Sequence, residues 1–203
     1  TGREAKDIIK QAPSSDGVEK IVFTGGEPLL RDDIFQLAEY AKKLGLYTIL
    51  HTNGLLFSEA TLNKLRDSLD QINLPLDGGD VATNDKQRGD GHFQKVLAVL
   101  NLLKDKDIMV VVSSVATAQN QASLLAVGET LKDLVDKGQA RIDKWRVFQF
   151  KPEGKAAEVK KQFQISKEIF LKLTEKITSQ EYSFPVQCIL SNSKEFHDSY
   201  KII

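Results

Sequence analysis

The chain has 203 residues, of which 41% are hydrophobic, and its 28 basic and 28 acidic side chains give a formal net charge of zero. This length fits one domain with a sizeable core, and the balanced charge disfavours binding to nucleic acid or to a membrane surface. No apolar run approaches the roughly 18 residues that a bilayer span needs, and the first residues lack a signal-peptide core. A single cysteine excludes an internal disulfide. We expect a cytoplasmic protein without nucleic-acid or membrane partners.

Strand-like runs and helical patterns alternate along the whole chain. Short apolar runs predict strands at about 20–24, 47–52, 71–76, 108–115, 145–150 and 185–190. Helical periodicity falls at 3–12, 32–44, 58–69, 91–105, about 121–137 and 166–179. Alternation predicts parallel strands joined by right-handed connections, so the fold class is α/β. About six such units exceed a small flavodoxin-like sheet and fall short of a closed eight-fold barrel. We expect residues 1–203 to form one domain, with a C-terminal extension from about 180.

Glycine and small polar residues follow five of these strands. In parallel α/β folds the ligand binds at the carboxyl ends of the strands. Each stretch also has the composition of an ordinary turn. Five of them on one rim nevertheless favour a ligand site. The stretches are Thr24–Pro28, His51–Gly54, Leu76–Asp80, Ser113–Asn120 and Phe150–Gly154.

The first of these stretches contains the glycine pair Gly25 and Gly26, then Glu27 and Pro28. Glycine lets a ligand approach the backbone closely because no Cβ intervenes. Backbone carbonyls and a carboxylate are acceptors, so the stretch suits a cationic or amino group, and the proline fixes the turn. A phosphate cradle would need the spacing G-x-x-x-x-G-K-[ST], which is absent, and an acid beside phosphate would repel it.

The sequence "GGEP" directly after a strand resembles the motif with which radical S-adenosylmethionine (SAM) enzymes hold the amino group of the cofactor. "TNG" at 52–54 and "LDG" at 76–78 extend the resemblance over roughly residues 18–150. The resemblance implies a partial (β/α)6 barrel of parallel strands. In the family pattern this motif follows the second strand, which would place a missing first strand before residue 1.

A narrower resemblance is to the viperin-like proteins, which are radical enzymes of nucleotide chemistry. It rests on Arg88–Gly91 (RGDG), Ser113–Val115 (SSV), Trp145–Gln149 (WRVFQ) and Ser191–Tyr200. Val111 stands where these proteins have a lysine, and Ser113 stands where they have an asparagine. The resemblance implies a small, nucleotide-like substrate. Because these two positions face the nucleotide substrate or the cofactor in the viperin-like proteins, the departures argue against the same substrate.

The resemblance also implies roles for individual residues. Arg88 would pair with the cofactor carboxylate, and Asp77 would accept from ribose hydroxyls. Alternatively, Arg88 is a solvated turn arginine and Asp77 an ordinary turn residue. No residue is assigned a catalytic role. The expected cofactor-binding residues are Gly25, Gly26, Glu27, Pro28, Asn53, Asp77, Arg88 and Ser113. The expected substrate-binding residues are Phe148, Gln149 and Lys151, although "WRVFQF" is also typical of a buried strand.

Radical SAM chemistry requires a [4Fe–4S] cluster, which the family holds with C-x3-C-x2-C on the loop after the first strand. The only cysteine here, Cys188, lies in an apolar run and fits a small buried residue. His51, His92 and His197 are too scattered for a metal site, so we expect no metal ligands.

The chain as given is therefore expected to be inactive, and two explanations compete. Either the cysteine segment lies outside the chain, which begins in mid-helix without a methionine, or the protein is a clusterless nucleoside-binding relative. We favour the first. The intact enzyme would reductively cleave S-adenosylmethionine to a 5′-deoxyadenosyl radical for hydrogen abstraction, with an electron donor such as a flavodoxin or ferredoxin. An open sheet edge where the first strand belongs would favour dimers.

Overall fold

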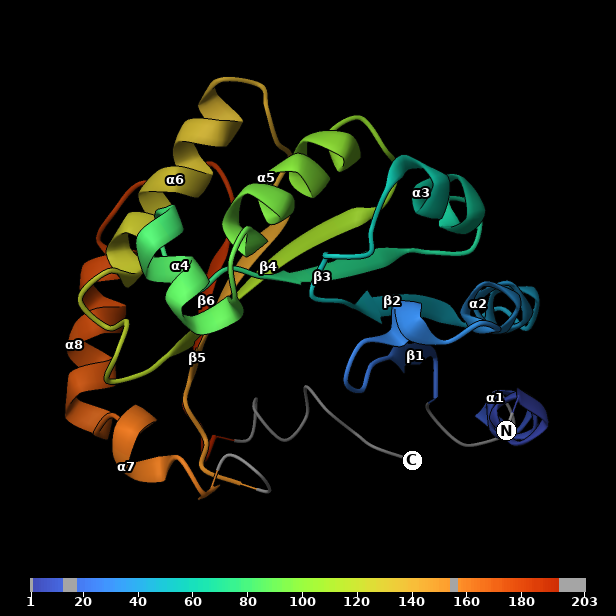
Figure 1. Ribbon diagram of the computed structural model, residues 1–203, viewed down its shortest axis with the longest axis horizontal. Coiled ribbons are helices and arrows are strands. Elements are labelled where there is room, and N and C mark those ends of the chain that lie inside the picture. Colours follow the sequence, from blue (N-terminus) through green and yellow to red (C-terminus); the bar gives the residue numbers. More distant parts are fainter. Residues whose placement is uncertain (1, 13–17, 154–156, 194–203) are drawn as a thin grey trace.

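The computed structural model describes residues 2–12, 18–153 and 157–193, and it contains one six-stranded sheet in the order β1-β2-β3-β4-β5-β6 (Figure 1). Every neighbouring pair of strands is parallel. The six predicted strand positions and the α/β class are therefore confirmed. The strands are β1 (Lys20–Phe23), β2 (Tyr47–His51), β3 (Gln71–Pro75), β4 (Met109–Ala116), β5 (Lys144–Gln149) and β6 (Val186–Ile189).

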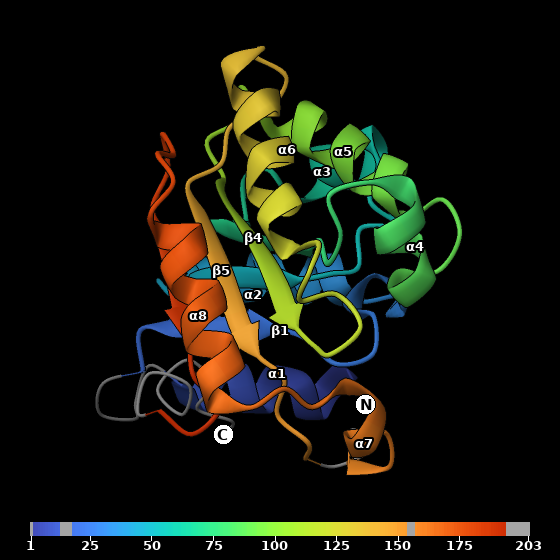
Figure 2. The ribbon, with the colours of Figure 1, turned by 90° about the vertical axis from the view of Figure 1, so that its left-hand side faces the viewer.

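The helices line the outer side of this curved sheet (Figure 1), and Figure 2 shows α6 and α8 lying over β4 and β5. All six predicted helices are present. The sequence did not predict α4 or α7. The eight residues of α4 are almost all polar or exposed, so its sequence lacks the periodic spacing of apolar residues that predicts a helix. The helices are α1 (Gly2–Gln11), the 3-10 turn η2 (Pro28–Leu30), α2 (Ile34–Lys43), α3 (Glu59–Leu65), α4 (Val81–Arg88), α5 (His92–Leu103), α6 (Leu124–Asp136), α7 (Lys160–Phe163) and α8 (Lys167–Thr178).

The main core fills the layer between the sheet and the helices. Successive residues of a strand point to opposite faces, so each strand contributes alternate side chains to this layer. Leu50, Ile72 and Val112 belong to it and are at most 1% exposed. In the same layer, Trp145 donates its indole N–H to Ser114 Oγ over 2.9 Å. The other residues of each strand face the inner, concave side of the sheet.

The N-terminal edge of the sheet is β1, which within the described residues pairs only with β2. A preceding strand and a dimer through this edge both stay predictions. His197 and most of the segment Ser191–Tyr200 lie outside the described residues. No helix in the described part of the chain is long and apolar enough to cross a membrane.

Candidate ligand-binding site

A pocket of about 210 Å³ opens at the carboxyl ends of β1 to β4. It brings together five of the eight expected cofactor residues, from the loops after β1 and β2, the end of helix α4 and strand β4. These five are Gly25, Gly26, Asn53, Arg88 and Ser113. The remaining lining residues are Thr24, His51, Thr52, Asn73, Leu74 and Pro75.

The glycine pair leaves bare backbone at one side of this pocket. Gly25 has φ +141°, a conformation that other residues rarely adopt. Gly26 has no such restriction, and a Cβ added there would meet no atom within 4 Å. Neither backbone strain nor packing of the chain therefore explains the glycine at position 26. What it provides is open space in front of the main chain.

Glu27 joins the glycine turn to the loop after β2. Its Oε1 accepts from Thr52 Oγ1 (2.7 Å) and from Leu29 N (3.1 Å), and its Oε2 accepts from Asn53 N (2.7 Å). It caps η2, which begins with Pro28. Because a carboxylate offers about four acceptor positions, three of which are used here, Oε2 keeps one for a further donor. The sequence did not reveal this structural role of Glu27.

Arg88 is held against the pocket by Asp77. Asp77 is 3% exposed, and its Oδ2 accepts from Arg88 Nε over 2.5 Å while its Oδ1 accepts from Val115 N over 2.7 Å. Both carboxylate oxygens thus have donors from the chain, and Asp77 is outside the pocket lining. This geometry gives no support to the expected contact between Asp77 and a ribose. It makes Asp77 the support of Arg88, whose two terminal amino groups are the ones that could pair with a ligand carboxylate.

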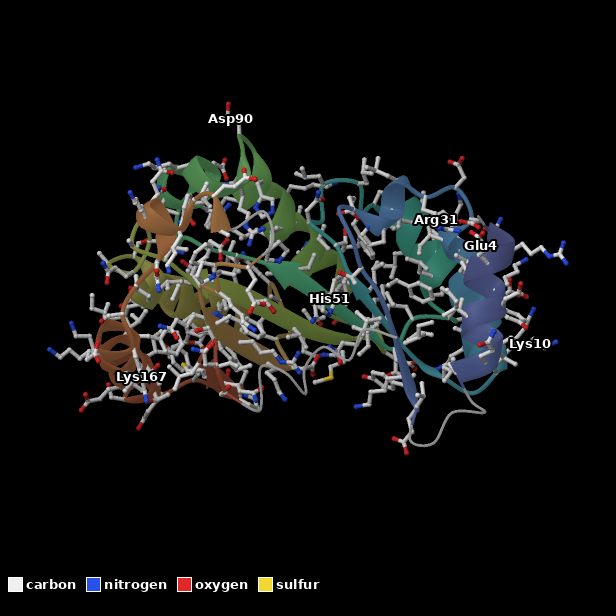
Figure 3. The ribbon with its side chains drawn as sticks, turned by 90° about the horizontal axis from the view of Figure 1, so that it is seen from below. Glu4, Lys10, Arg31, His51, Asp90 and Lys167 are labelled. Carbon is white, nitrogen blue, oxygen red and sulfur yellow. The ribbon has the colours of Figure 1, made fainter. Side chains whose placement is uncertain are left out.

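Polar side chains of β2 and β3 line the pocket: His51, which Figure 3 labels near the middle of the view, and Asn73, which is itself bonded to Gln71. Gln71 Nε2 donates to Asn73 Oδ1 (2.7 Å), and Asn73 Nδ2 lies 2.6 Å from His51 Nε2. Since the Asn73 amide nitrogen donates, His51 accepts at Nε2 and carries its proton on Nδ1. Burial, and next the charge of Arg146, lower the pKa of His51 to about 4. A neutral imidazole therefore lines the pocket at neutral pH.

Sequence reasoning missed Gln71 and Asn73. The available signal was their spacing: two polar residues at alternate positions of an otherwise apolar strand share one face.

The three expected substrate residues lie outside this pocket. Gln149 is 8% exposed, its Nε2 donates to Ile165 O (3.2 Å), and its Oε1 accepts from Ser191 Oγ (3.0 Å). Phe148 is 6% exposed, and Lys151 pairs with Glu153 over 2.9 Å. Gln149 thus connects the end of β5 to the segment just before α8 and to the segment after β6. Its amide has partners within the chain, so the geometry does not favour the expected substrate contact.

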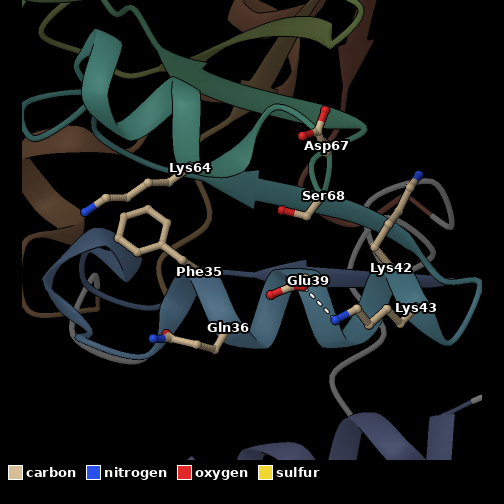
Figure 4. Close-up of a pocket in the computed structure, with 8 residues that line it drawn as sticks. All are labelled: Phe35, Gln36, Glu39, Lys42, Lys43, Lys64, Asp67 and Ser68. Carbon is tan, nitrogen blue, oxygen red and sulfur yellow. Dashed lines mark hydrogen bonds and ion pairs between the residues drawn. The ribbon is translucent and has the colours of Figure 1, made fainter.

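A larger pocket of about 600 Å³ lies on the outer surface between α2 and α3 (Figure 4). The Lys64 ammonium lies 4.9 Å from the centre of the Phe35 ring, and Lys43 pairs with Glu39 over 2.6 Å. None of the expected site residues lines it, so we do not assign it to the candidate site. Its remaining lining residues are Gln36, Lys42, Asp67 and Ser68.

The chain belongs to the radical SAM superfamily, because the family model of that superfamily matches residues 1–133. Among curated proteins, an AdoMet-dependent heme synthase of Methanosarcina barkeri is 32% identical over 136 residues, which are 66% of this chain and 39% of that protein. A PqqA peptide cyclase of Rhizobium meliloti is 34% identical over 110 residues, which are 53% of this chain and 29% of that protein. The chain spans about two fifths of the length of the heme synthases that it matches.

Solved structures share the fold. Streptococcus suis SuiB bound to S-adenosylmethionine superposes with a TM-score of 0.73 at 18% identity, covering 99% of this chain and 46% of that one. The structure of anSMEcpe with bound AdoMet and a peptide gives a TM-score of 0.69 at 20% identity, covering 88% of this chain and 51% of that one. The partial-barrel architecture is therefore that of the superfamily.

The two cofactors that the superfamily implies fit this chain differently. The open backbone at Gly26 and the guanidinium of Arg88 suit the amino and carboxylate groups of S-adenosylmethionine. A [4Fe–4S] cluster does not fit, because the sequence has one cysteine, and burial raises the pKa of its thiol. The described residues also contain no group of three His, Cys, Asp or Glu side chains that could hold a metal. The residues of this chain cannot ligate such a cluster.

Proposed function

We propose that this chain binds S-adenosylmethionine at the ends of β1 to β4 and forms the core of a radical SAM enzyme. The observation that carries the proposal is the open backbone of Gly25 and Gly26, which faces the same pocket as Asn53 and Arg88. Nothing in the packing of the chain explains the missing side chain at Gly26, whereas a closely bound ligand would.

The amino and carboxylate groups of the cofactor would bind on different sides of the pocket. The amino group would donate to the carbonyls of the glycine pair and to the remaining acceptor position on Glu27 Oε2. The carboxylate would pair with Arg88, which Asp77 orients. Charge-assisted contacts of this kind contribute about 1.5–3 kcal/mol each. Asn53 and Ser113 would contact the nucleoside.

The share of this chain in the reaction is to bind and orient the cofactor. Three thiolates for a cluster would have to come from residues outside this chain, and an electron donor such as a flavodoxin or ferredoxin would serve the whole enzyme. Without them, the chain alone would act only as a nucleoside-binding module, a second candidate favoured by its single cysteine.

The inner face of the sheet favours a substrate with an anionic group. The six strands contain no Asp or Glu, whereas β5 contributes Lys144 and Arg146. Arg146 acts on the pKa of His51, and its Nε is buried without a hydrogen-bond partner among the described residues. Together with the viperin-like segments, this charge supports a small nucleotide-like substrate. The names of the relatives instead point to a heme and to a peptide as reaction partners.

Calorimetric titration of the chain with S-adenosylmethionine tests the proposal. We expect measurable binding and about a tenfold weaker affinity for Arg88→Gln, since one charge-assisted contact is lost. Arg66→Gln is the matched control, because Arg66 is exposed and pairs only loosely, over 3.6 Å, with the exposed Asp67.

Two outcomes count against the proposal. Absence of heat at millimolar ligand would contradict cofactor binding by this chain. Equal affinity for adenosine and S-adenosylmethionine would favour the nucleoside-binding module, because adenosine lacks the amino and carboxylate groups.

A further inference from the structure

His92 is a buried histidine behind the pocket with no role in the site as described so far. It begins α5, is 1% exposed, and its Nδ1 lies 3.0 Å from Asn84 Nδ2. Asn84 is also fully buried, and its Oδ1 accepts from the main-chain N–H of Asp77 over 3.1 Å. This bond fixes the amide orientation, so Asn84 donates to His92 through Nδ2. His92 therefore accepts at Nδ1 and carries its proton on Nε2.

The other nitrogen of His92, Nε2, is buried and has no hydrogen-bond partner among the described residues. Val96 lies one turn further along α5 on the same face, and a Cβ on Gly54 would lie 3.8 Å from Val96 Cγ2. This face of α5 thus packs against the loop that carries Asn53. The main chain of Asn53 acts on the ionisation of His92, so it lies close to the imidazole.

The imidazole therefore lies between two structures that line the pocket. On one side, Asn84 connects it to Asp77 and hence to Arg88. On the other side is the loop that presents Asn53, whose N–H is held by Glu27 Oε2. We propose that neutral His92 is a positioning residue that fixes the Asn53 loop relative to the Asp77–Arg88 pair and thereby sets the affinity of the pocket. This inference rests on the proposed function.

Protonation of His92 would break the arrangement for a geometric reason. A second N–H on Nδ1 would face the amino group of Asn84, and two donors cannot bond to each other. The Asn84 amide would have to rotate, and its bond from Asp77 N would be lost. The charged groups that act on His92 are Arg88 and Asp85 from α4 and Asp77 from the loop after β3.

Burial and next the charge of Arg88 lower the pKa of His92, against the opposing effects of Asp77, the Asn53 main chain and Asp85. The histidine is therefore neutral at pH 7, and the connection is lost only as the pH falls below the ordinary histidine value of 6.5. The affinity for S-adenosylmethionine should therefore fall as the pH falls below 6.5.

Two substitutions separate this role from simple packing. Glutamine at position 92 can accept from Asn84 and donate toward Asn53 without titrating, whereas phenylalanine fills space and does neither. As the pH falls below 6.5 we expect the wild-type affinity for S-adenosylmethionine to weaken, by up to about tenfold once His92 is protonated, roughly one hydrogen-bonded connection. His92→Gln should bind similarly above and below this pH, and His92→Phe should bind about tenfold more weakly throughout. Val96→Ala, a packing control on the same helix face, should keep the wild-type pH dependence.

The inference is overturned if His92→Gln and His92→Phe show the same affinity and the same pH profile. Nitrogen NMR of the imidazole supplies a readout that needs no ligand. We expect the proton on Nε2, titration below pH 6.5, and an Asp77 amide resonance that shifts along the same curve. A proton on Nδ1 would refute the connection between His92 and Asp77. So would an Asp77 amide resonance that does not shift as His92 titrates. Failure of wild-type binding alongside a coupled titration would refute cofactor binding but leave the connection supported.

Discussion

The rim of β1 to β4 and the rim of β5 and β6 carry similar residues but have different structures. At the first rim, the glycine pair, Asn53 and Arg88 surround a pocket. At the second, Gln149 bonds to Ile165 and Ser191, and Lys151 pairs with Glu153. The strand ends of a parallel sheet therefore form a binding site only where their polar groups or backbone face a pocket. Where these groups bond to other parts of the chain, no site forms.

The support behind the two rims also differs. Behind the first rim, buried polar side chains hold the pocket residues: Asp77, Asn84 and His92 are each at most 3% exposed. At the second rim, the polar contacts join neighbouring segments directly. We therefore expect substitutions of these buried supporting residues to affect both stability and ligand binding, and substitutions at the second rim to affect stability alone.

The largest expected effect is that of Asp77→Ala. It removes the partner of Arg88 and leaves the Val115 N–H without an acceptor, which should lower the free energy of unfolding by about 3 kcal/mol or more. Chemical denaturation measures it. Asp67→Ala is the control, because Asp67 is 90% exposed and should change stability by no more than about 0.5 kcal/mol. Equal effects of the two substitutions would contradict the assigned role of Asp77.

The second largest expected effect is the pH dependence of the unfolding free energy that His51 causes. Its pKa of about 4 in the folded chain lies below the ordinary 6.5, so the unfolded chain binds the proton first as the pH falls. This contribution to stability is fully present above pH 6.5 and is lost between pH 6.5 and pH 4, by roughly 2–3 kcal/mol. His51→Gln should remove that part of the pH dependence of the unfolding free energy. Identical pH profiles of variant and wild type would contradict a neutral buried His51.

At the second rim, Gln149→Leu should cost about 1–2 kcal/mol of stability, because the bonds to Ile165 O and Ser191 Oγ are lost. The affinity for S-adenosylmethionine should stay within twofold of wild type in the same calorimetric titration. A tenfold loss of affinity in a folded variant would instead place Gln149 in the binding site, as the sequence first indicated.

The sequence predicted the architecture well because its information is local and periodic. Every strand contains a short apolar stretch, and regular alternation with helices implies a parallel sheet. The strand ends likewise identified the rim, and Gly25, Gly26, Asn53, Arg88 and Ser113 do line one pocket. Helix α4 escaped prediction because its residues show no apolar period.

The sequence could not predict which side chains from distant segments of the chain contact each other. Whether Asp77 faces a ligand or Arg88, and whether Gln149 faces a substrate or Ser191, depends on side-chain contacts across 11 and 42 positions of the chain. A strand-end carboxylate has the same local sequence in either case. The structure distinguishes them, since buried acceptors take donors from the chain wherever these are within reach.

The most direct test of the account is Gly26→Ala, measured by unfolding and by titration with S-adenosylmethionine. A Cβ at this position meets no atom of the chain within 4 Å, so stability should change by no more than about 0.5 kcal/mol. The same methyl group would stand where the ligand approaches the backbone, so affinity should fall by tenfold or more. A variant that is equally stable and binds S-adenosylmethionine as tightly as wild type would contradict the proposal that the glycine pair receives the cofactor.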